Sequence, residues 1–169
     1  LVSSVRPLYE FLRAGDEIKF QVIYGKYCKC LGNAQMLAGH FQDAVTSLDV
    51  ALHMFRLNAG SEGVDDVQAA SALHSLGDAY GRTCEFVKSA NAYEEALKIR
   101  KKLLVSDRKR WLLEYSKLLN NLGLKYNTLH RYAEAEACFS ELMPIRRELA
   151  AGDSRNLQWL ASALQSYAG

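Results

Sequence analysis

Apolar residues recur at intervals of three and four along most of the chain, which is the spacing of a helix that buries one face. Residues with turn propensity, among them Gly, Ser and Asp, interrupt this pattern at several points. The pattern therefore predicts six long helices in succession. Their expected bounds are 16–37, 41–57, 65–81, 86–105, 107–126 and 132–150, and a further helix is expected over 154–168.

The same order of small and large residues returns with an almost constant period. Leu-Gly pairs stand at 31–32, 76–77 and 122–123, which are 45 and 46 residues apart. The glycines are expected where two helices touch, and large side chains are expected to fill the space between them. A period carried by both helices of a unit indicates a helical solenoid. Residues that follow at the same offsets are Phe41, Phe86 and Tyr132; Ala44, Ser89 and Ala135; and Leu48, Tyr93 and Phe139.

Both ends of the chain fall inside the repeat. The segment 7–16 aligns with 144–153, and the offset of 137 residues equals three periods. We therefore expect a single domain over residues 1–169, with repeats at about 16–60, 64–106 and 107–152 and partial repeats at 1–15 and 153–169.

Several positions carry specific structural expectations. Asp65 and Asp66 are expected to cap the third helix, as Ser106 and Asp107 are for the fifth. Pro144 should kink or interrupt the sixth helix. The buried stripe of the first helix is expected to contain Ile18, Val22, Cys28, Leu31 and Gln35.

Composition narrows the class of protein. The chain has 169 residues, 49% hydrophobic and 24% charged, with a net charge of +2. No apolar run approaches the roughly 18 residues of a membrane span, and no secretory leader is visible. The four cysteines form no C-x-x-C pair, so we expect them to be reduced and buried in a cytoplasmic protein. They are Cys28, Cys30, Cys84 and Cys138.

The order Leu-Gly-x-x-Tyr, followed by an aromatic residue and Ala, resembles the tetratricopeptide repeat. The units here exceed the usual length of about 34 residues, and long units are similar to those of kinesin light chains and of STAND-type NTPases. The resemblance implies an all-α superhelix of three full helix pairs flanked by a half repeat at each end. The matching residues are Leu73, Leu76, Gly77, Tyr80, Tyr93 and Ala96, then Leu119, Leu122, Gly123, Tyr126, Ala135 and Phe139; in the first copy Gln35 replaces the tyrosine.

In such a solenoid the first helix of each pair lines a concave groove. Amide side chains both donate and accept hydrogen bonds, which suits an extended peptide backbone, and lysines suit carboxylates. The resemblance therefore implies a non-enzymatic protein-interaction module that binds a peptide or partner segment in this groove, with an acidic segment as one alternative. The residues expected to line it are Lys26, Lys29, Asn33, Ser71, His74, Asp78, Arg82, Lys117, Asn120, Asn121 and Asn127.

Lys29 and Asn33 also resemble the first half of the carboxylate clamp, by which some tetratricopeptide domains hold the C-terminal carboxylate of chaperones. Lys117 falls where that family places a second lysine. Ser75 and Asn121 depart from the pattern, since an asparagine and an arginine are expected there. A clamp, a groove for another peptide segment and a solvated polar face all remain open at this point.

No other pattern indicates chemistry. The four histidines are scattered, with His40 and His130 in turns, and no nucleophile elbow or Gly-rich phosphate loop is present. We therefore expect no catalytic residue, metal or cofactor. The basic runs 100–102 and 108–110 are typical of solvated helix ends, with an acidic partner or a nucleic-acid backbone as the alternative. Trp111 and Trp159 are expected to pack inside the protein.

Two further interpretations concern the partner. The chain could be the sensor or scaffold segment of a larger STAND-type signalling protein. The final expected helix has an apolar side that no following helix covers, so a homodimer formed through this helix is a second expectation. Binding to membranes and to nucleic acid is not expected.

Overall fold

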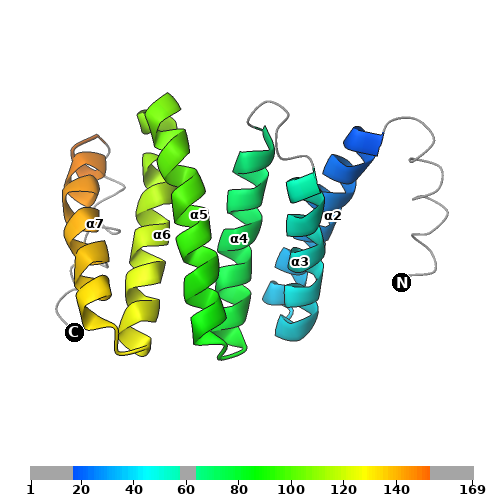
Figure 1. Ribbon diagram of the computed structural model, residues 1–169, viewed down its shortest axis with the longest axis horizontal. Helices are drawn as coiled ribbons and strands as arrows, with labels where there is room; N and C mark the ends of the chain where they lie inside the picture. Colours follow the sequence, from blue (N-terminus) through cyan, green and yellow to red (C-terminus); the bar gives the residue numbers. More distant parts are fainter. Residues whose placement is uncertain (1–16, 58–63, 153–169) are drawn as a thin grey trace. The chain divides into compact units, whose positions relative to one another are not determined.

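The computed structural model describes residues 17–57 and 64–152, which form two compact units, Leu1–Ala79 and Tyr80–Gly169. Every regular element in the described part is an α-helix (Figure 1). The helix α4 contributes its last three residues to the second unit. The elements are α2 (Glu17–Leu37), α3 (Phe41–Leu57), α4 (Val64–Arg82), α5 (Phe86–Ser106), α6 (Arg108–Thr128) and α7 (Tyr132–Gly152).

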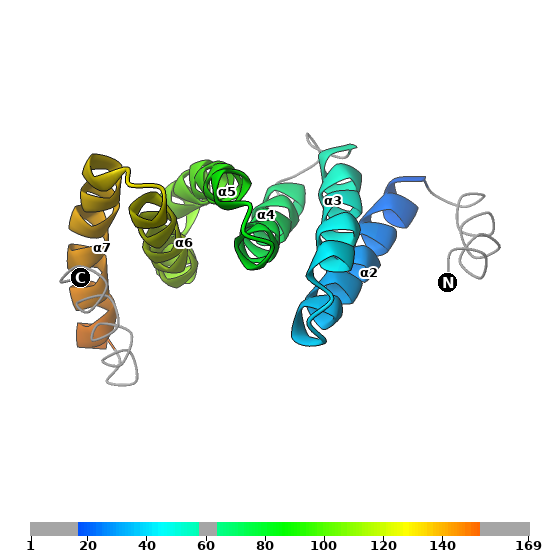
Figure 2. The same ribbon diagram turned by 90° about the horizontal axis from the view of Figure 1, so that it is seen from below.

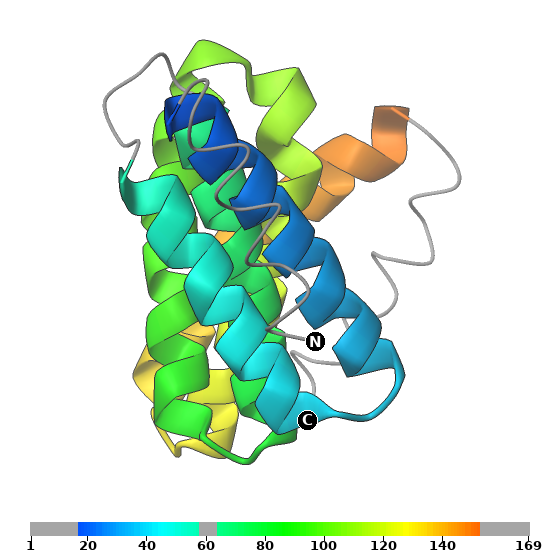
Figure 3. The same cartoon turned by 90° about the vertical axis from the view of Figure 1, so that its right-hand side faces the viewer.

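In the first unit, α2 and α3 run antiparallel and side by side (Figure 3). Two glycines on α2 permit their close approach. A Cβ atom added at Gly32 would lie 2.6 Å from Cγ of Leu48, and one added at Gly25 would lie 2.8 Å from Cε1 of Phe55. Both distances are too short for real carbon atoms, so only glycine fits between these helices. The residues of α3 predicted to face inward are all buried: Ala44, Val45, Leu48, Ala51, Leu52 and Phe55.

In the second unit, α6 lies between α5 and α7 and packs on both (Figures 1 and 2). Gly123 repeats the role of Gly32, because an added Cβ would lie 2.8 Å from Cε1 of Phe139. The core therefore follows the repeat that the sequence predicts. Its buried side chains on α5 and α6 include Ala90, Tyr93, Ala96, Leu112, Tyr115, Leu118, Leu119, Leu122 and Tyr126.

The turns that join α2 to α3, α4 to α5 and α6 to α7 share one backbone conformation. Gly39, Cys84 and His130 have φ values of 82°, 61° and 58°, in the left-handed region. In the first turn the N–H of His40 donates to the carbonyl of Gln35 (2.9 Å), and that of Gly39 donates to Met36 (3.2 Å). This is the hydrogen-bond pattern of a Schellman motif, which satisfies the last carbonyls of a helix. The corresponding bonds are Glu85 to Tyr80 and Cys84 to Gly81, and Arg131 to Tyr126 and His130 to Asn127.

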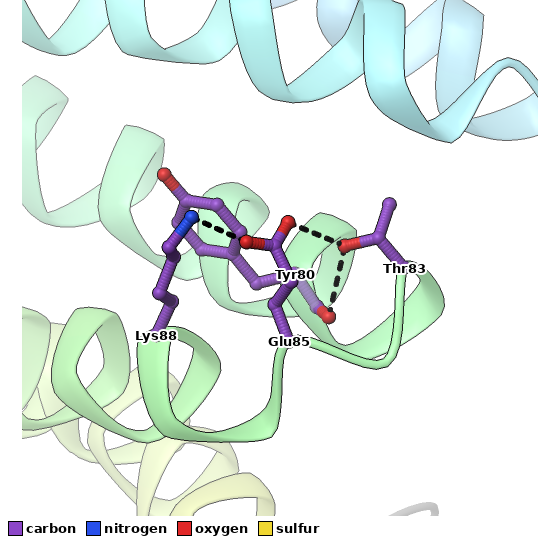
Figure 4. Close-up of polar contacts among 4 residues, drawn as sticks. All are labelled: Tyr80, Thr83, Glu85 and Lys88. Carbon is purple, nitrogen blue, oxygen red and sulfur yellow. Dashed lines mark hydrogen bonds and ion pairs between the residues drawn. The ribbon is translucent and has the colours of Figure 1, made fainter.

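Side chains reinforce the turn between α4 and α5 (Figure 4). The hydroxyl of Thr83 lies 3.2 Å from the carbonyl oxygen of Tyr80 and 3.0 Å from Oε1 of Glu85. Lys88 forms an ion pair with Glu85, and its ammonium lies 5.4 Å from the centre of the Tyr80 ring. Lys88, and to a smaller extent Thr83, hold the pKa of Glu85 below its usual value. The turn therefore joins the end of α4 to the first turn of α5 through one carboxylate.

The all-α fold of paired helices is confirmed, and the helix bounds agree with the predictions within two residues. Asp107 caps α6 as predicted, since its Oδ1 accepts from the backbone N–H of Arg110 at 3.0 Å. The partial repeats at 1–15 and 153–169, and with them Trp159 and the expected dimer helix, lie outside the described residues. The single domain over 1–169 stays a prediction.

Some local expectations were wrong. Helix α4 begins at Val64, so Asp65 and Asp66 lie in its first turn rather than at its cap. Helix α7 continues through Pro144, so the proline does not interrupt it, whereas the kink that was the other expectation stays a prediction. Ile18 is 56% exposed and Leu31 is 36% exposed. The side of α2 that faces α3 carries Gly25 and Gly32, which are seven residues, or about two helical turns, apart. The other buried residues of α2 are Phe20 and Cys28.

Two further corrections concern residue types. Tyr132 is 62% exposed, and its hydroxyl lies 2.8 Å from Nδ1 of the exposed His130. Cys28 and Cys138 are buried thiols as predicted, but Cys30 and Cys84 are exposed. Cys30 follows Cys28 by two positions and so points away from the same helix face, whereas Cys84 occupies the left-handed turn position.

Candidate functional site

The first unit brings two predicted groove residues from successive first helices into contact. The ammonium of Lys29 on α2 donates to Oε1 of Gln68 at 2.8 Å and to Oγ of Ser71 at 3.4 Å, both on α4. Lys29 is half-buried by this contact. The groove positions of α2 and α4 are therefore neighbours in space, as a shared polar surface requires.

The other predicted residues of the first unit flank this contact along their helices. Lys26 and Asn33 are exposed, and with Lys29 they share one face of α2, since the spacings of three and four keep them within a narrow arc. On α4, His74 is half-buried and its Nε2 lies 3.9 Å from Oδ2 of the exposed Asp78.

In the second unit the predicted residues of α6 occupy one side of that helix. At 100° per residue they lie opposite the stripe that packs on α5 and α7. Asn120 is half-buried, and its buried Oδ1 has no hydrogen-bond partner among the described residues, while Lys117 donates to Oε1 of Glu114 at 2.8 Å. Asn121 and Asn127 are half-buried as well, and Arg82 is exposed near the end of α4.

The predicted set is thus divided between the two units. Six of these residues, Ser71 among them, lie in the first unit, and five lie in the second. Within each unit the neighbouring members share a helix face or touch. A single hollow that unites both groups stays a prediction.

Sequence reasoning missed a pocket on the other side of α6. It has a volume of about 410 Å³ and lies between α5 and α7, with α6 as its floor. The sequence signal was the stripe Tyr115, Leu119, Leu122 and Tyr126, whose spacing is that of a buried helix face. The remaining lining residues are Glu94, Leu97, Lys98 and Lys101 on α5, and Glu134, Ala137, Cys138 and Glu141 on α7.

Two tyrosine–glutamate hydrogen bonds join the walls of this pocket to its floor. The hydroxyl of Tyr115 donates to Oε1 of Glu141 at 2.6 Å, and that of Tyr126 donates to Oε1 of Glu94 at 2.8 Å. Burial, and then the accepting glutamate, raise the pKa of both tyrosines well above the usual value. Burial is also the main cause that raises the pKa of the Cys138 thiol to about 11. The pocket therefore holds neutral hydroxyls and a neutral thiol over the ordinary pH range.

The comparisons with known proteins agree with this architecture. Residues 69–107, which cover most of α4 and all of α5, match the family model described as tetratricopeptide repeat. These residues therefore form a tetratricopeptide repeat. The resemblance carried by Leu73, Gly77 and Tyr80 is thereby confirmed.

The chain is also similar to a solved structure. The crystal structure of BtubC (BKLC) from P. vanneervenii matches with a TM-score of 0.66 and 21% identity, over 95% of this chain and 59% of that one. At this identity the likeness shows a shared fold, and the chain spans 59% of the length of BtubC. No curated protein sequence matches the chain.

A tetratricopeptide-repeat fold indicates a module for protein–protein interaction or scaffolding. Among the described residues, no group of three or more His, Cys, Asp or Glu side chains could hold a metal ion. None of the helices in this part of the chain combines the length and apolar character needed to cross a bilayer.

Proposed function

We propose that this protein is a non-enzymatic interaction module that binds an extended segment of a partner protein along the polar faces of its first helices. The observation that carries the proposal is the contact of Lys29 with Ser71, because it joins the groove positions of α2 and α4. On α6 the corresponding positions lie opposite the stripe that packs on α5 and α7.

The side chains on these faces suit a peptide backbone. Asn33 is exposed on α2, and Asn121 and Asn127 are half-buried on α6. Each amide can accept from a peptide N–H and donate to a peptide carbonyl, so a ladder of such groups can hold an extended segment with little dependence on its sequence. A typical affinity for a single groove would be micromolar, about −8 kcal/mol.

The contacts of the lysines favour this proposal over a carboxylate clamp. Lys29 donates to Gln68 and Ser71, and Lys117 pairs with Glu114. Both lysines are thus engaged within the protein, which leaves fewer of their N–H donors for a C-terminal carboxylate. Asn33 is exposed on α2, so its amide can bind a peptide backbone without breaking these lysine contacts.

Selection of displayed random peptides on the purified chain would supply a probe for the test. The fluorescence anisotropy of a selected peptide would then be titrated with Lys29→Ala, Asn33→Ala and Asn121→Ala. We expect Asn33→Ala and Asn121→Ala each to weaken binding by about fivefold to tenfold, which corresponds to roughly one hydrogen bond. Lys29→Ala should weaken binding because it removes the contact that joins the groove positions of α2 and α4. Gln42→Ala on α3 and Glu136→Ala on α7 are matched controls, since both residues are exposed on second helices. If all three groove variants bind like the parent, these faces are not the binding site.

Two alternatives stay predictions. One is that the chain is a sensor or scaffold segment of a STAND-type protein, and the other is that it self-associates. Light scattering over a concentration series would test self-association, because a dimer changes the measured mass.

A further inference from the structure

The structure brings together two basic runs that are separate in the sequence. Asp107 alone separates α5 from α6, and Trp111 stands in the first turns of α6. The guanidinium carbon of Arg100 lies 4.8 Å from the centre of the Trp111 ring, and that of Arg110 lies 4.5 Å from it. One residue from each run therefore contacts the same indole.

Positive charge is concentrated at this place. Residues 98–110 contain seven basic residues and one acidic residue, a local charge of +6, whereas the whole chain carries +2. The rest of the chain is therefore net negative. Asp107, the one acidic residue of the segment, is engaged as the cap of α6.

Only part of this charge is compensated within the described residues. Arg100 is 6% exposed and Arg108 pairs with Glu148 at 2.7 Å. Lys101, Lys102 and Lys109 are exposed, and no acidic side chain of the described residues pairs with them. These three ammonium groups are available to a partner.

An apolar side chain lies among the free lysines. Val105 is 89% exposed and follows Lys101 and Lys102 by one helical turn, so it stands beside them on α5. An exposed apolar residue flanked by cations suits a partner segment that alternates acidic and apolar residues.

The contacts of Trp111 decide between an acidic polypeptide and a nucleic acid. Single-stranded nucleic acids gain affinity by stacking bases on aromatic side chains. The Trp111 ring is half-buried and already holds two guanidinium groups. It is therefore not a free stacking platform, and the exposed groups offer charge and one apolar contact.

We propose that Lys101, Lys102, Val105 and Lys109, here named the basic end, form a docking surface for an acidic segment of a partner polypeptide, with an apolar residue of that segment on Val105. The proposal goes beyond the groove, because the basic end lies at the junction of α5 and α6 and none of its residues belongs to the predicted groove. Salt should weaken this binding, since the contacts are exposed charges.

The test uses two fluorescein-labelled peptides on the full chain, Glu-Glu-Glu-Leu-Glu-Glu-Glu and the same peptide with Ser in place of Leu. The triple variant Lys101→Gln, Lys102→Gln, Lys109→Gln should bind the first peptide roughly tenfold more weakly than the parent, as expected for three exposed ion pairs. Val105→Ser should weaken binding of the Leu peptide by roughly threefold and leave the Ser peptide unchanged.

A second triple variant, Lys19→Gln, Arg56→Gln, Lys88→Gln, removes the same charge from other exposed positions and should bind like the parent. Asn33→Ala and Asn121→Ala should also bind like the parent, which separates this proposal from the groove. Equal loss in both triple variants would mean that only net charge matters. The proposal is also overturned if the parent does not bind the peptides, or if it binds oligothymidylate or phosphatidylserine vesicles more tightly than the Leu peptide.

Discussion

Gly123 lies directly against the ring of Phe139, so that a Cβ atom at position 123 would stand 2.8 Å from both Cε1 and Cζ of that ring. Gly32 and Leu48 repeat the relationship 91 residues earlier, with 2.6 Å to Cγ of Leu48. The absence of a side chain at these two positions sets how closely the paired helices approach. The repeat therefore requires a residue without a side chain at these two positions.

Gly123→Ala should destabilise the protein by about 1–3 kcal/mol, because the added methyl group forces the Phe139 ring out of its place. Gly81→Ala is the matched control in the same unit. Its Cβ would meet the flexible end of Lys125 at 3.1 Å, and alanine favours the helix. We expect this control to be neutral or slightly stabilising. Urea unfolding followed by circular dichroism measures both, and equal losses for the two variants would contradict the steric account.

Gly39→Ala and Cys84→Gly should change stability in opposite directions. Gly39 has a φ of 82° and no atom within 4 Å of a built Cβ, so alanine would cost about 1 kcal/mol through backbone conformation alone. Cys84 has a φ of 61°, and glycine should relieve that strain, with a net gain of up to about 1 kcal/mol. Thermal and urea unfolding of the two variants check the sign. A loss of stability in Cys84→Gly as large as that in Gly39→Ala would refute the prediction.

Tyr115→Phe and Tyr126→Phe should each destabilise the protein by about 1 kcal/mol, because each removes a hydrogen bond to a glutamate. Folding raises the pKa of both hydroxyls. Their contribution is therefore present below about pH 10 and is lost as the pH rises above that value. Urea unfolding at about pH 8 and about pH 10.5 should show a smaller pH-dependent loss in the double variant than in the parent. The same loss in both proteins would exclude the tyrosines as the cause.

The four cysteines should react with iodoacetamide at two rates. Cys30 and Cys84 are exposed, whereas burial raises the pKa of Cys28 and raises that of Cys138 to about 11. Since the thiolate is the nucleophile, Cys138 should react at least about tenfold more slowly than Cys84 at neutral pH. Peptide mass spectrometry over a time course measures each rate. In urea all four should react alike, and a fast Cys138 in the folded protein would show that the pocket is open.

The positions of the helices and the faces that they bury could be predicted, because both follow from the spacing of apolar residues along the chain. The spacing of Ala44, Leu48 and Phe55 determines which face of α3 is buried, and Gly32 and Gly123 mark where a neighbour must approach. Errors arose where a residue's environment depends on distant segments. Tyr132 matches Phe41 in register and likewise begins its helix, but Phe41 is half-buried whereas Tyr132 is 62% exposed.

The site was less predictable than the fold. The polar positions of α2 and α4 followed from the repeat, and the contact of Lys29 with Ser71 agrees with them. The pocket between α5 and α7 could not be predicted from the sequence, because the spacing of Tyr115 and Tyr126 is that of ordinary core residues. Their hydroxyls become part of a site only when Glu141 and Glu94 come within hydrogen-bonding distance.

The sequence by itself determined the helices, their period, their turns and the glycine contacts. These features depend on residues that lie within one helix or in two successive helices. The tertiary structure alone decided which charges are compensated and which remain free. Arg100 and Arg110 meet on Trp111, and Arg108 reaches Glu148 forty residues away. Such pairings depend on distances through space, which a one-dimensional pattern of charges does not contain.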